Sequence, residues 1–222
     1  MNYFDDLIRE MTRLFMCKYG RNEYPNQDEV SCRGIYDIAI ECNPDYIVDI
    51  GTNYGASTLS LAKACLDLKK PLSILTTIDK DHDHWLKETK TGLIPFFKKY
   101  GVDINAINEI VSDFAVLDPN KFIFKGKKGF IFYDIHDIPE KSFMNIFLNS
   151  WTQNFSGTLA LHDMSVSDIS TYVCLGDHFI TTHFEGKSFS GFQEVLPFID
   201  YLNKNKIAIH DIPRTSVAYI LR

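Results

Sequence analysis

The chain has 222 residues, of which 45% are hydrophobic, and its formal net charge is −6 at pH 7. This length and composition suit one domain with a full core, while the negative charge argues against nucleic-acid binding, which needs clustered Lys and Arg. The sequence shows no signal peptide and no membrane span, so we expect a cytosolic protein that binds neither nucleic acid nor membranes.

Two helices are expected before the first strand. Apolar residues recur at helical spacing over 3–19 and again over 28–42, and the segment between them is rich in Gly, Pro and Asn. We therefore expect a single domain made of an N-terminal helical cap, residues 1–45, and a core, residues 46–222.

Short apolar runs alternate with helical patterns along the rest of the chain. The expected strands are 46–50, 73–78, 107–111, 129–133 and 158–161. Such alternation predicts right-handed crossovers and a parallel sheet with helices on both faces. Two further strands, 207–210 and 216–221, are too close in sequence for a crossover and should form an antiparallel hairpin. The expected fold is a doubly wound α/β fold with a mostly parallel, seven-stranded sheet.

The most informative stretch is the strand at 46–50 and the loop that follows it. The strand is apolar except for Asp49, and the loop contains Gly51 and Gly55, which allow a sharp turn and close backbone approach to a ligand. A dinucleotide fingerprint would need glycine at Asn53, and the Gly-Lys-Ser/Thr of a phosphate loop is absent. The pattern favours a nucleoside cofactor that carries an amino group and a carboxylate.

The run Val48-Asp49-Ile50-Gly51-Thr52-Asn53-Tyr54-Gly55 resembles the first motif of the class I S-adenosylmethionine-dependent methyltransferases. That motif reads hydrophobic-hydrophobic-(Asp/Glu)-hydrophobic-Gly-x-x-x-Gly. A parallel sheet that ends in one antiparallel hairpin also resembles the architecture of this family. The resemblance implies a Rossmann-like methyltransferase fold with S-adenosylmethionine as the cofactor. The alternative is an ordinary strand, turn and helix whose glycines serve only the turn.

The resemblance implies a role for each polar residue at the strand ends, which meet at one edge of a parallel sheet. Asp49 would face the methionine amino group, and Asp79 would bind the ribose hydroxyls, with Asp81 as the fallback. A helix-capping role remains open for Asp79 and Asp113. The full set implied at the cofactor is Asp49, Gly51, Thr52, Asn53, Gly55, Ser57, Asp79, Ser112, Asp113 and Asp134.

Methyl transfer to an oxygen needs a base or a metal that makes the acceptor nucleophilic. The chain resembles most the catechol-type and sugar-modifying O-methyltransferases, which implies metal ligands at Asp134 and Asp163, and two such carboxylates suit Mg²⁺. We expect His136 to be the base because imidazole titrates near neutral pH, with Asp137 second. His162 is a further catalytic candidate, and a buried, hydrogen-bonded histidine fits its position equally well.

Two positions depart from these relatives. Asp137 stands where the sugar-modifying enzymes have His and the catechol-type enzymes have Lys, and Met164 stands where the catechol-type enzymes have Asn. A cluster of helix caps and salt bridges is the alternative to a metal site. Two other functions also remain open, an NAD(P)-dependent Rossmann oxidoreductase and a non-catalytic cofactor-binding module.

We expect a small-molecule or sugar acceptor, and a homodimer is compatible with this assignment. The aromatic residues that flank the expected rim do not identify the acceptor. The cysteines are scattered, odd in number and without C-x-x-C spacing, so we expect reduced packing residues. They are Cys17, Cys32, Cys42, Cys65 and Cys174.

Overall fold

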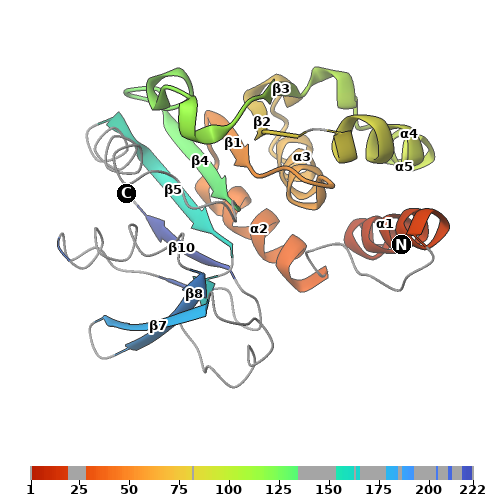
Figure 1. Ribbon diagram of the computed structural model, residues 1–222. Helices are drawn as coiled ribbons and strands as arrows, with labels where there is room; N and C mark the ends of the chain where they lie inside the picture. The colour runs from red at the N-terminus through yellow and green to blue at the C-terminus, as the bar shows by residue number, and fades with distance from the viewer. Residues whose placement is uncertain are drawn as a thin grey trace.

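Figure 1 shows the computed structural model of the chain. The residues that the structure describes are 2–19, 29–81, 83–134, 154–162, 164–165, 179–184, 187–192, 204, 210–211 and 217–221.

The main sheet has seven strands in the order β3-β2-β1-β4-β5-β10-β9. From one edge to the other they are β3 (Asn108–Val111), β2 (Leu75–Asp79), β1 (Tyr46–Ile50), β4 (Lys128–Tyr133), β5 (Ser156–Leu161), β10 (Ala218–Leu221) and β9 (His210–Asp211). The strands from β3 to β5 are parallel, whereas β10 is antiparallel to both of its neighbours. The predicted α/β fold, with a mostly parallel sheet and an antiparallel hairpin, is confirmed.

Most predicted strand positions agree with the structure to within two residues. The strand at 46–50 has the predicted bounds. The strand predicted at 73–78 begins at Leu75, because the three residues before it form the short 3₁₀ helix η1 (Leu72–Ile74). Of the strand predicted at 207–210, the structure describes His210, which with Asp211 forms β9 and pairs with β10, whereas residues 207–209 lie outside the described residues.

The helices before the sheet are α1 (Tyr3–Tyr19) and α2 (Glu29–Cys42), as predicted. The later helical segments are α3 (Ala56–Asp67), the π-helical segment η2 (His84–Thr89), α4 (Lys90–Gly92) and α5 (Ile94–Tyr100). Three 3₁₀ turns follow, η3 (Ile104–Ala106), η4 (Phe114–Val116) and η5 (Pro119–Lys121). The predicted boundary at residue 45 falls between α2 and β1, and the division into cap and core stays a prediction.

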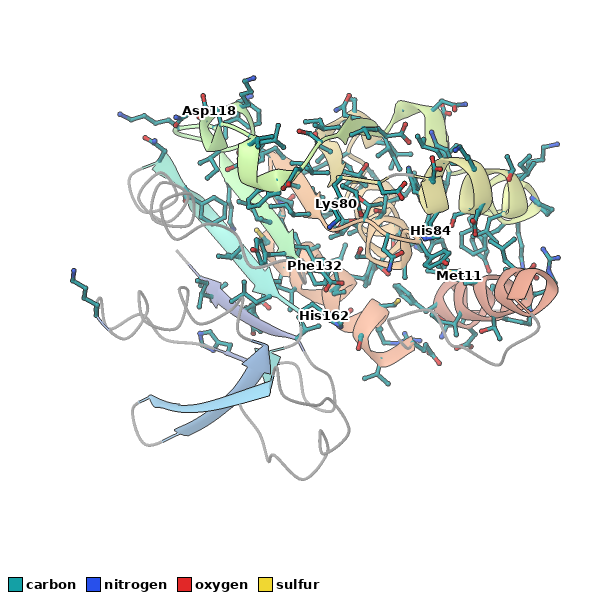
Figure 2. The ribbon with its side chains drawn as sticks, viewed as in Figure 1. Met11, Lys80, His84, Asp118, Phe132 and His162 are labelled. Atoms are coloured by element: carbon teal, nitrogen blue, oxygen red, sulfur yellow. The ribbon has the colours of Figure 1, made fainter. Side chains whose placement is uncertain are left out.

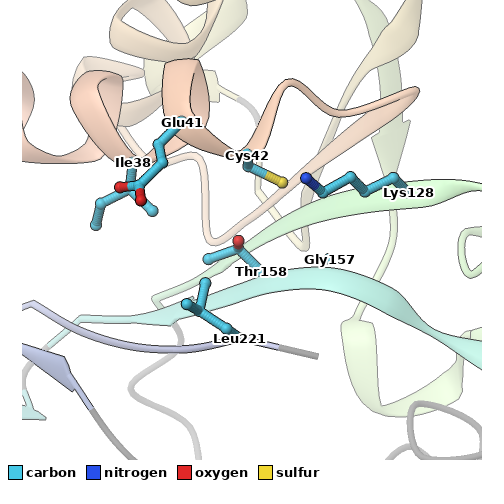
Figure 3. A pocket seen from close by; sticks show the side chains of 7 residues that line it. All are labelled: Ile38, Glu41, Cys42, Lys128, Gly157, Thr158 and Leu221. Atoms are coloured by element: carbon cyan, nitrogen blue, oxygen red, sulfur yellow. The ribbon is translucent and has the colours of Figure 1, made fainter.

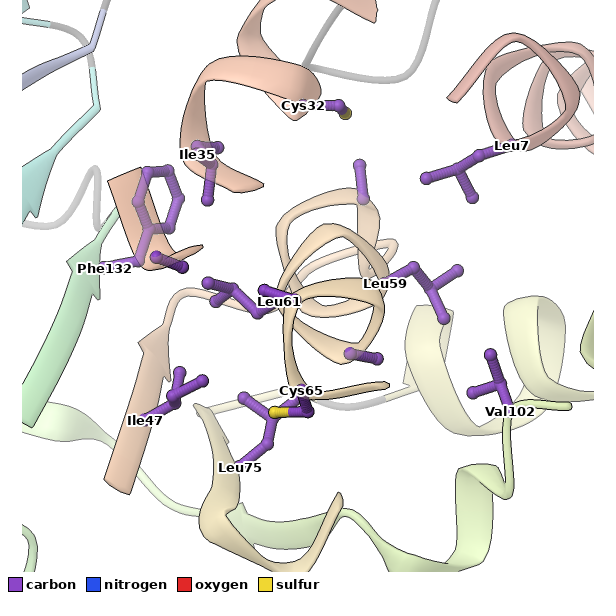
Figure 4. Packing of buried hydrophobic residues seen from close by; sticks show 14 of the residues in the cluster. Leu7, Cys32, Ile35, Ile47, Leu59, Leu61, Cys65, Leu75, Val102 and Phe132 are labelled. Carbon is purple, nitrogen blue, oxygen red and sulfur yellow. The ribbon is translucent and has the colours of Figure 1, made fainter. Parts of the chain in front are cut away.

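Helix α3 lies at the centre of the hydrophobic core. Figure 4 shows side chains from α1, α2 and the strands converging on it, among them Leu7, Ile35 and Ile47. The start of α1 is also tied to this centre by a hydrogen bond of 2.8 Å from the Tyr3 hydroxyl to the backbone oxygen of Leu59. The two N-terminal helices therefore pack directly on the helix that follows the glycine loop.

Helix α1 is also fixed to α5 by a buried carboxylate. Asp6 is only 1% exposed and accepts hydrogen bonds from Lys99 and Tyr100, and from Arg9 at 2.7 Å. The hydrogen bonds from Lys99 and Tyr100 lower the pKa of Asp6 to about 2. The carboxylate is therefore held in its charged form within this contact.

A second, antiparallel sheet has the order β6-β8-β7 and was not predicted. Its strands are β6 (Met164–Ser165), β8 (Lys187–Phe192) and β7 (Phe179–Phe184). Since β5 ends at Leu161 and β6 begins at Met164, this small sheet follows directly from the carboxyl end of β5. It lies below β10 in Figure 1.

Two composition-based expectations can be compared with the described residues. Cys32, Cys42 and Cys65 are buried, as expected of packing residues, and form no disulfide within the described part of the chain, whereas the side chains of Cys17 and Cys174 lie outside it. None of the helices in the described ranges is both long enough and apolar enough to span a membrane.

Candidate active site

The carboxyl ends of five strands form one continuous rim. Backbone hydrogen bonds continue the sheet one step past the strands, from Ser112 N to Asp79 O (2.8 Å), Gly51 N to Ile78 O (2.8 Å), Asp134 N to Ile50 O (2.8 Å) and His162 N to Tyr133 O (3.0 Å). They place residues predicted for the cofactor and residues predicted for the chemistry along the same edge.

Both glycines of the loop after β1 are required by close packing within the protein. A Cβ on Gly51 would lie 1.9 Å from the backbone oxygen of Asp134, and a Cβ on Gly55 would lie 2.2 Å from the Trp85 ring. Gly51 has φ +88° and Gly55 has φ +81°, where side chains are disfavoured, and Asn53 between them has φ +45°. The loop is therefore a compact left-handed turn held on both sides.

Asp49 lies beneath this loop and is completely buried. Its carboxylate accepts hydrogen bonds from the hydroxyls of Ser57, at 3.0 Å to each oxygen, and Thr58. Burial raises the pKa of Asp49 to about 7, against the opposing effect of these two hydrogen bonds. Asp49 thus anchors the first turn of α3 to β1. The predicted contacts of Asp49 and Ser57 with a cofactor stay predictions.

Asp79 occupies the last position of β2 and is half-buried. Its Oδ2 accepts a hydrogen bond from the Asn53 backbone N–H at 2.8 Å, and its Oδ1 accepts one from the Asp81 N–H at 3.0 Å. Asp79 therefore joins the glycine loop to the loop after β2, and each of its oxygens keeps acceptor capacity for a ligand hydroxyl. Asp81 is exposed and caps Asp83, which makes it the weaker candidate of the two.

Thr52 contributes a buried side-chain hydroxyl to this loop. It is only 2% exposed, and its hydroxyl has no hydrogen-bond partner in the described part of the chain. Helix α3 begins directly after this loop, and no side chain in the described ranges caps it. A buried hydroxyl without a partner beside uncapped backbone N–H groups suits an anionic ligand group such as a carboxylate.

Ser112 and Asp113 follow β3, next to the end of β2. Ser112 is half-buried and its backbone N–H donates to Asp79, whereas Asp113 is exposed. Their place beside Asp79 fits the predicted adenine contact, which stays a prediction.

Asp134 and His162 meet at the ends of β4 and β5. The imidazole Nδ1 lies 3.0 Å from Asp134 Oδ1, and the side chains are only 7% and 12% exposed for His162 and Asp134. Figure 2 shows His162 on the same edge as Phe132, whose ring centroid is 6.2 Å from the imidazole. With Asp134 ionised, the proton belongs on Nδ1, which leaves Nε2 as a proton acceptor.

The other predicted catalytic and metal residues, His136, Asp137 and Asp163, lie outside the described residues. Within the described ranges, no group of three or more His, Cys, Asp or Glu side chains is arranged to hold a metal ion. The structure therefore joins one predicted metal ligand, Asp134, with one predicted catalytic residue, His162.

A cavity of about 350 Å³ opens at the opposite edge of the main sheet (Figure 3). Its walls come from the end of α2, the first residues of β4 and β5, and the end of β10. They include Cys42, Lys128 and Leu221. Because ligands of open α/β sheets bind at the carboxyl ends of the strands, we do not assign this cavity to the candidate site.

No family model and no curated protein sequence matches this chain significantly. Solved structures match it over most of its length. A putative caffeoyl-CoA O-methyltransferase from Staphylococcus aureus has a TM-score of 0.56 and 19% identity, with 99% of this chain and 98% of that chain covered. CalS11, a TDP-rhamnose 3′-O-methyltransferase, has a TM-score of 0.53 and 11% identity, with 99% and 92% covered.

A third solved structure is a methyltransferase from Podospora anserina, PaMTH1, bound to S-adenosylhomocysteine. It has a TM-score of 0.52 and 14% identity, with 85% of this chain and 88% of that chain covered. At these identities the likeness establishes the fold. The chain shares the Rossmann-like fold of class I methyltransferases, as the motif at residues 48–55 predicted.

Proposed function

We propose that this chain is an S-adenosylmethionine-dependent methyltransferase that acts on a hydroxyl group of a small molecule or sugar. The observation that carries the proposal is the arrangement of the loop after β1. Within the described residues it combines the buried hydroxyl of Thr52, which has no hydrogen-bond partner there, the start of α3, which no side chain caps there, and the half-buried carboxylate of Asp79. These groups match a ligand that has a carboxylate at one end and ribose hydroxyls at the other.

Different residues of the chain would bind different parts of the cofactor. The Thr52 hydroxyl and the backbone N–H groups at the start of α3 would bind the methionine carboxylate. Asp79, held by the Asn53 and Asp81 N–H groups, would accept hydrogen bonds from the ribose. Ser112 and Asp113, next along the rim, would contact the adenine. The spacing of these groups follows the strand order β1, β2 and β3.

The pair of Asp134 and His162 is the part of the described rim that suits proton transfer. When bound, S-adenosylmethionine supplies a methyl group on a sulfonium. The acceptor oxygen forms the new C–O bond, the C–S bond breaks with its electron pair going to sulfur, and the acceptor proton must leave. His162 Nε2 can take that proton while Asp134 holds the ring and stabilises the imidazolium. His136 and Asp137 remain alternative bases.

We further propose that a divalent cation such as Mg²⁺ binds at the rim. Asp134 places one hard oxygen ligand at the rim, and Asp163 follows His162 directly in the sequence. The metal would orient the acceptor and lower the pKa of its hydroxyl. Cytosolic location and a homodimeric state are further proposals.

The names of the structurally similar proteins support a small hydroxylated acceptor. CalS11 is a sugar O-methyltransferase, and the Staphylococcus aureus protein is named as a putative caffeoyl-CoA enzyme. The test is a screen of hydroxylated sugars and phenols with S-adenosylmethionine that carries a labelled methyl group, each with and without EDTA. We expect label in at least one acceptor class, and loss of transfer with EDTA.

Three outcomes would correct the proposal. Transfer that is indifferent to EDTA would exclude the metal and leave a histidine base. If S-adenosylhomocysteine binds but no acceptor is labelled, the chain is a cofactor-binding module, and if NAD binds in its place, it is an oxidoreductase.

A further inference from the structure

We infer that Trp85 and Thr89, on the π-helical segment η2, are positioning residues that set the shape of the cofactor loop and thereby its affinity for the cofactor. This inference rests on the proposed function for the identity of the ligand. Neither residue lies in the loop motif at 48–55.

Trp85 packs against the loop at Gly55. Its ring occupies the space that a Cβ on Gly55 would fill, with ring atoms 2.2 and 2.3 Å from that position, and it is completely buried. Gly55 in turn has φ +81° and immediately precedes α3. The indole ring can therefore pack against Gly55 only because this residue has no side chain.

The indole is itself fixed by a polar chain at the edge of the sheet. Its Nε1–H donates to Glu109 Oε1 on β3 at 2.7 Å, and the same oxygen lies 2.6 Å from Lys90 Nζ. Lys90 follows η2 directly in α4. Trp85 and Lys90 therefore both bind Glu109, which ties η2 and α4 to β3 and restricts the rotation of the indole ring.

Thr89 holds the loop from the side. Its buried hydroxyl donates to the backbone oxygen of Tyr54 at 2.9 Å, one residue before Gly55. The Tyr54 ring also stacks on His84, at the other end of η2, with ring centroids 4.3 Å apart and an interplanar angle of 24°. Both ends of η2 thus contact the same loop residue.

The loop needs such contacts because one of its non-glycine residues has an unfavourable backbone conformation. Asn53 has φ +45°, and a left-handed conformation of a non-glycine residue persists only where the surroundings impose it. Asn53 also donates its N–H to Asp79, so a loop that relaxes would move the donor away from the predicted ribose acid. π-Helical turns are frequent at functional sites, where they re-aim side chains.

The test compares Thr89→Val with Thr91→Val. The Thr89 hydroxyl bonds the loop, whereas within the described residues the Thr91 hydroxyl donates to the backbone oxygens of Lys87 and Glu88 in the preceding helical turn. We expect Thr89→Val to weaken S-adenosylhomocysteine binding about 3- to 10-fold by calorimetry, the scale of one hydrogen bond, and Thr91→Val to leave it unchanged. Thr89→Ser keeps the hydroxyl and should restore the affinity.

Amide hydrogen exchange provides a second measurement that needs no ligand. We expect faster exchange over residues 52–57 in Thr89→Val and wild-type exchange there in Thr91→Val. Equal affinity and exchange in the two variants would overturn the inference, as would faster exchange with unchanged affinity. If wild-type protein fails to bind S-adenosylhomocysteine, the proposed function is wrong, while the exchange data still decide whether η2 shapes the loop.

Discussion

The two halves of the rim are built in different ways. On the β1–β2 side, the carboxylates of Asp49 and Asp79 accept hydrogen bonds from hydroxyl and backbone N–H groups of the loops beside them. On the β4–β5 side, the carboxylate of Asp134 lies against the imidazole of His162. The first arrangement fixes backbone shape, and the second can hold or move a proton.

This difference predicts that binding and turnover can be separated by mutation. Changes on the β1–β2 side should alter cofactor affinity, and changes on the β4–β5 side should alter turnover with little effect on affinity. The two sides touch at Gly51, whose Cα faces the backbone oxygen of Asp134, so a change there should affect both.

We expect Gly51→Ala to have the largest effect. The added methyl would meet the Asp134 backbone oxygen at 1.9 Å in a left-handed conformation, which should lower the free energy of unfolding by about 2–5 kcal/mol. Urea denaturation measures the change. Gly101→Ala is the control, because it also has positive φ but no atom within 4 Å, so we expect a loss of about 1–2 kcal/mol. Equal losses would show that the close approach is unimportant.

His162→Gln should lower methyl transfer to an acceptor found in the screen about 10²- to 10⁴-fold, because we propose that the imidazole is the base. The dissociation constant of S-adenosylhomocysteine should stay within about threefold of the wild-type value, a change of less than one net hydrogen bond. His210→Gln, at an exposed histidine of β9, is the control. Unchanged turnover in His162→Gln would move the base to His136 or Asp137.

Asp79→Ala should weaken S-adenosylhomocysteine binding by about 1.5–3 kcal/mol, the scale of hydrogen bonds to a charged group. Calorimetric titration measures this, and the fold should remain intact because Asp79 is not part of the apolar core. Asp81→Ala is the matched change at the neighbouring, exposed carboxylate and should bind normally. A loss in Asp81→Ala alone would mean that the ribose acid is misplaced.

The pH dependence of stability should distinguish Asp49 from an ordinary strand-end acid. Its pKa is about 7 in the folded protein, above the value near 4 of an unfolded chain. Stability is therefore greatest below pH ~4 for this group, and unfolding free energy should fall as pH rises towards about 7, by at most about 1.4 kcal/mol per pH unit. Asp49→Asn should flatten this slope, and an equal slope in both proteins would contradict the burial effect. Asp6, with a pKa of about 2, titrates outside this range.

The sequence was sufficient for the β1 strand, the glycine loop and the mostly parallel arrangement of the strands. These depend on local signals, such as the apolar run from Tyr46 to Ile50 and the glycines that follow it. Near the chain's end the signals are weaker. Of the strand expected at 207–210 only His210 lies within the described residues, and the hairpin of β7 and β8 was missed although Glu185 and Gly186 alone separate its strands in the sequence.

Within the site, contacts between distant residues were the part that sequence reasoning missed. The hydrogen bond from the Ser57 hydroxyl to Asp49, on the preceding strand, was not predicted, and the predicted contact of Ser57 with the cofactor stays a prediction. The roles of Trp85 and Thr89 depend on the crossover that brings η2 against Gly55. One signal was available, since Trp85 is a large apolar residue inside the polar run Asp81-His-Asp-His-Trp-Leu-Lys-Glu.

The most direct test of the central claim is calorimetric titration of the wild-type protein with S-adenosylhomocysteine and, separately, with NAD. We predict that S-adenosylhomocysteine binds one site per chain and stabilises the protein by about 2.7 kcal/mol at 100 times its Kd, while NAD gives no comparable effect. Binding of NAD without binding of S-adenosylhomocysteine, or binding of neither, would contradict the assignment of the loop between β1 and α3 as a methyl-donor site.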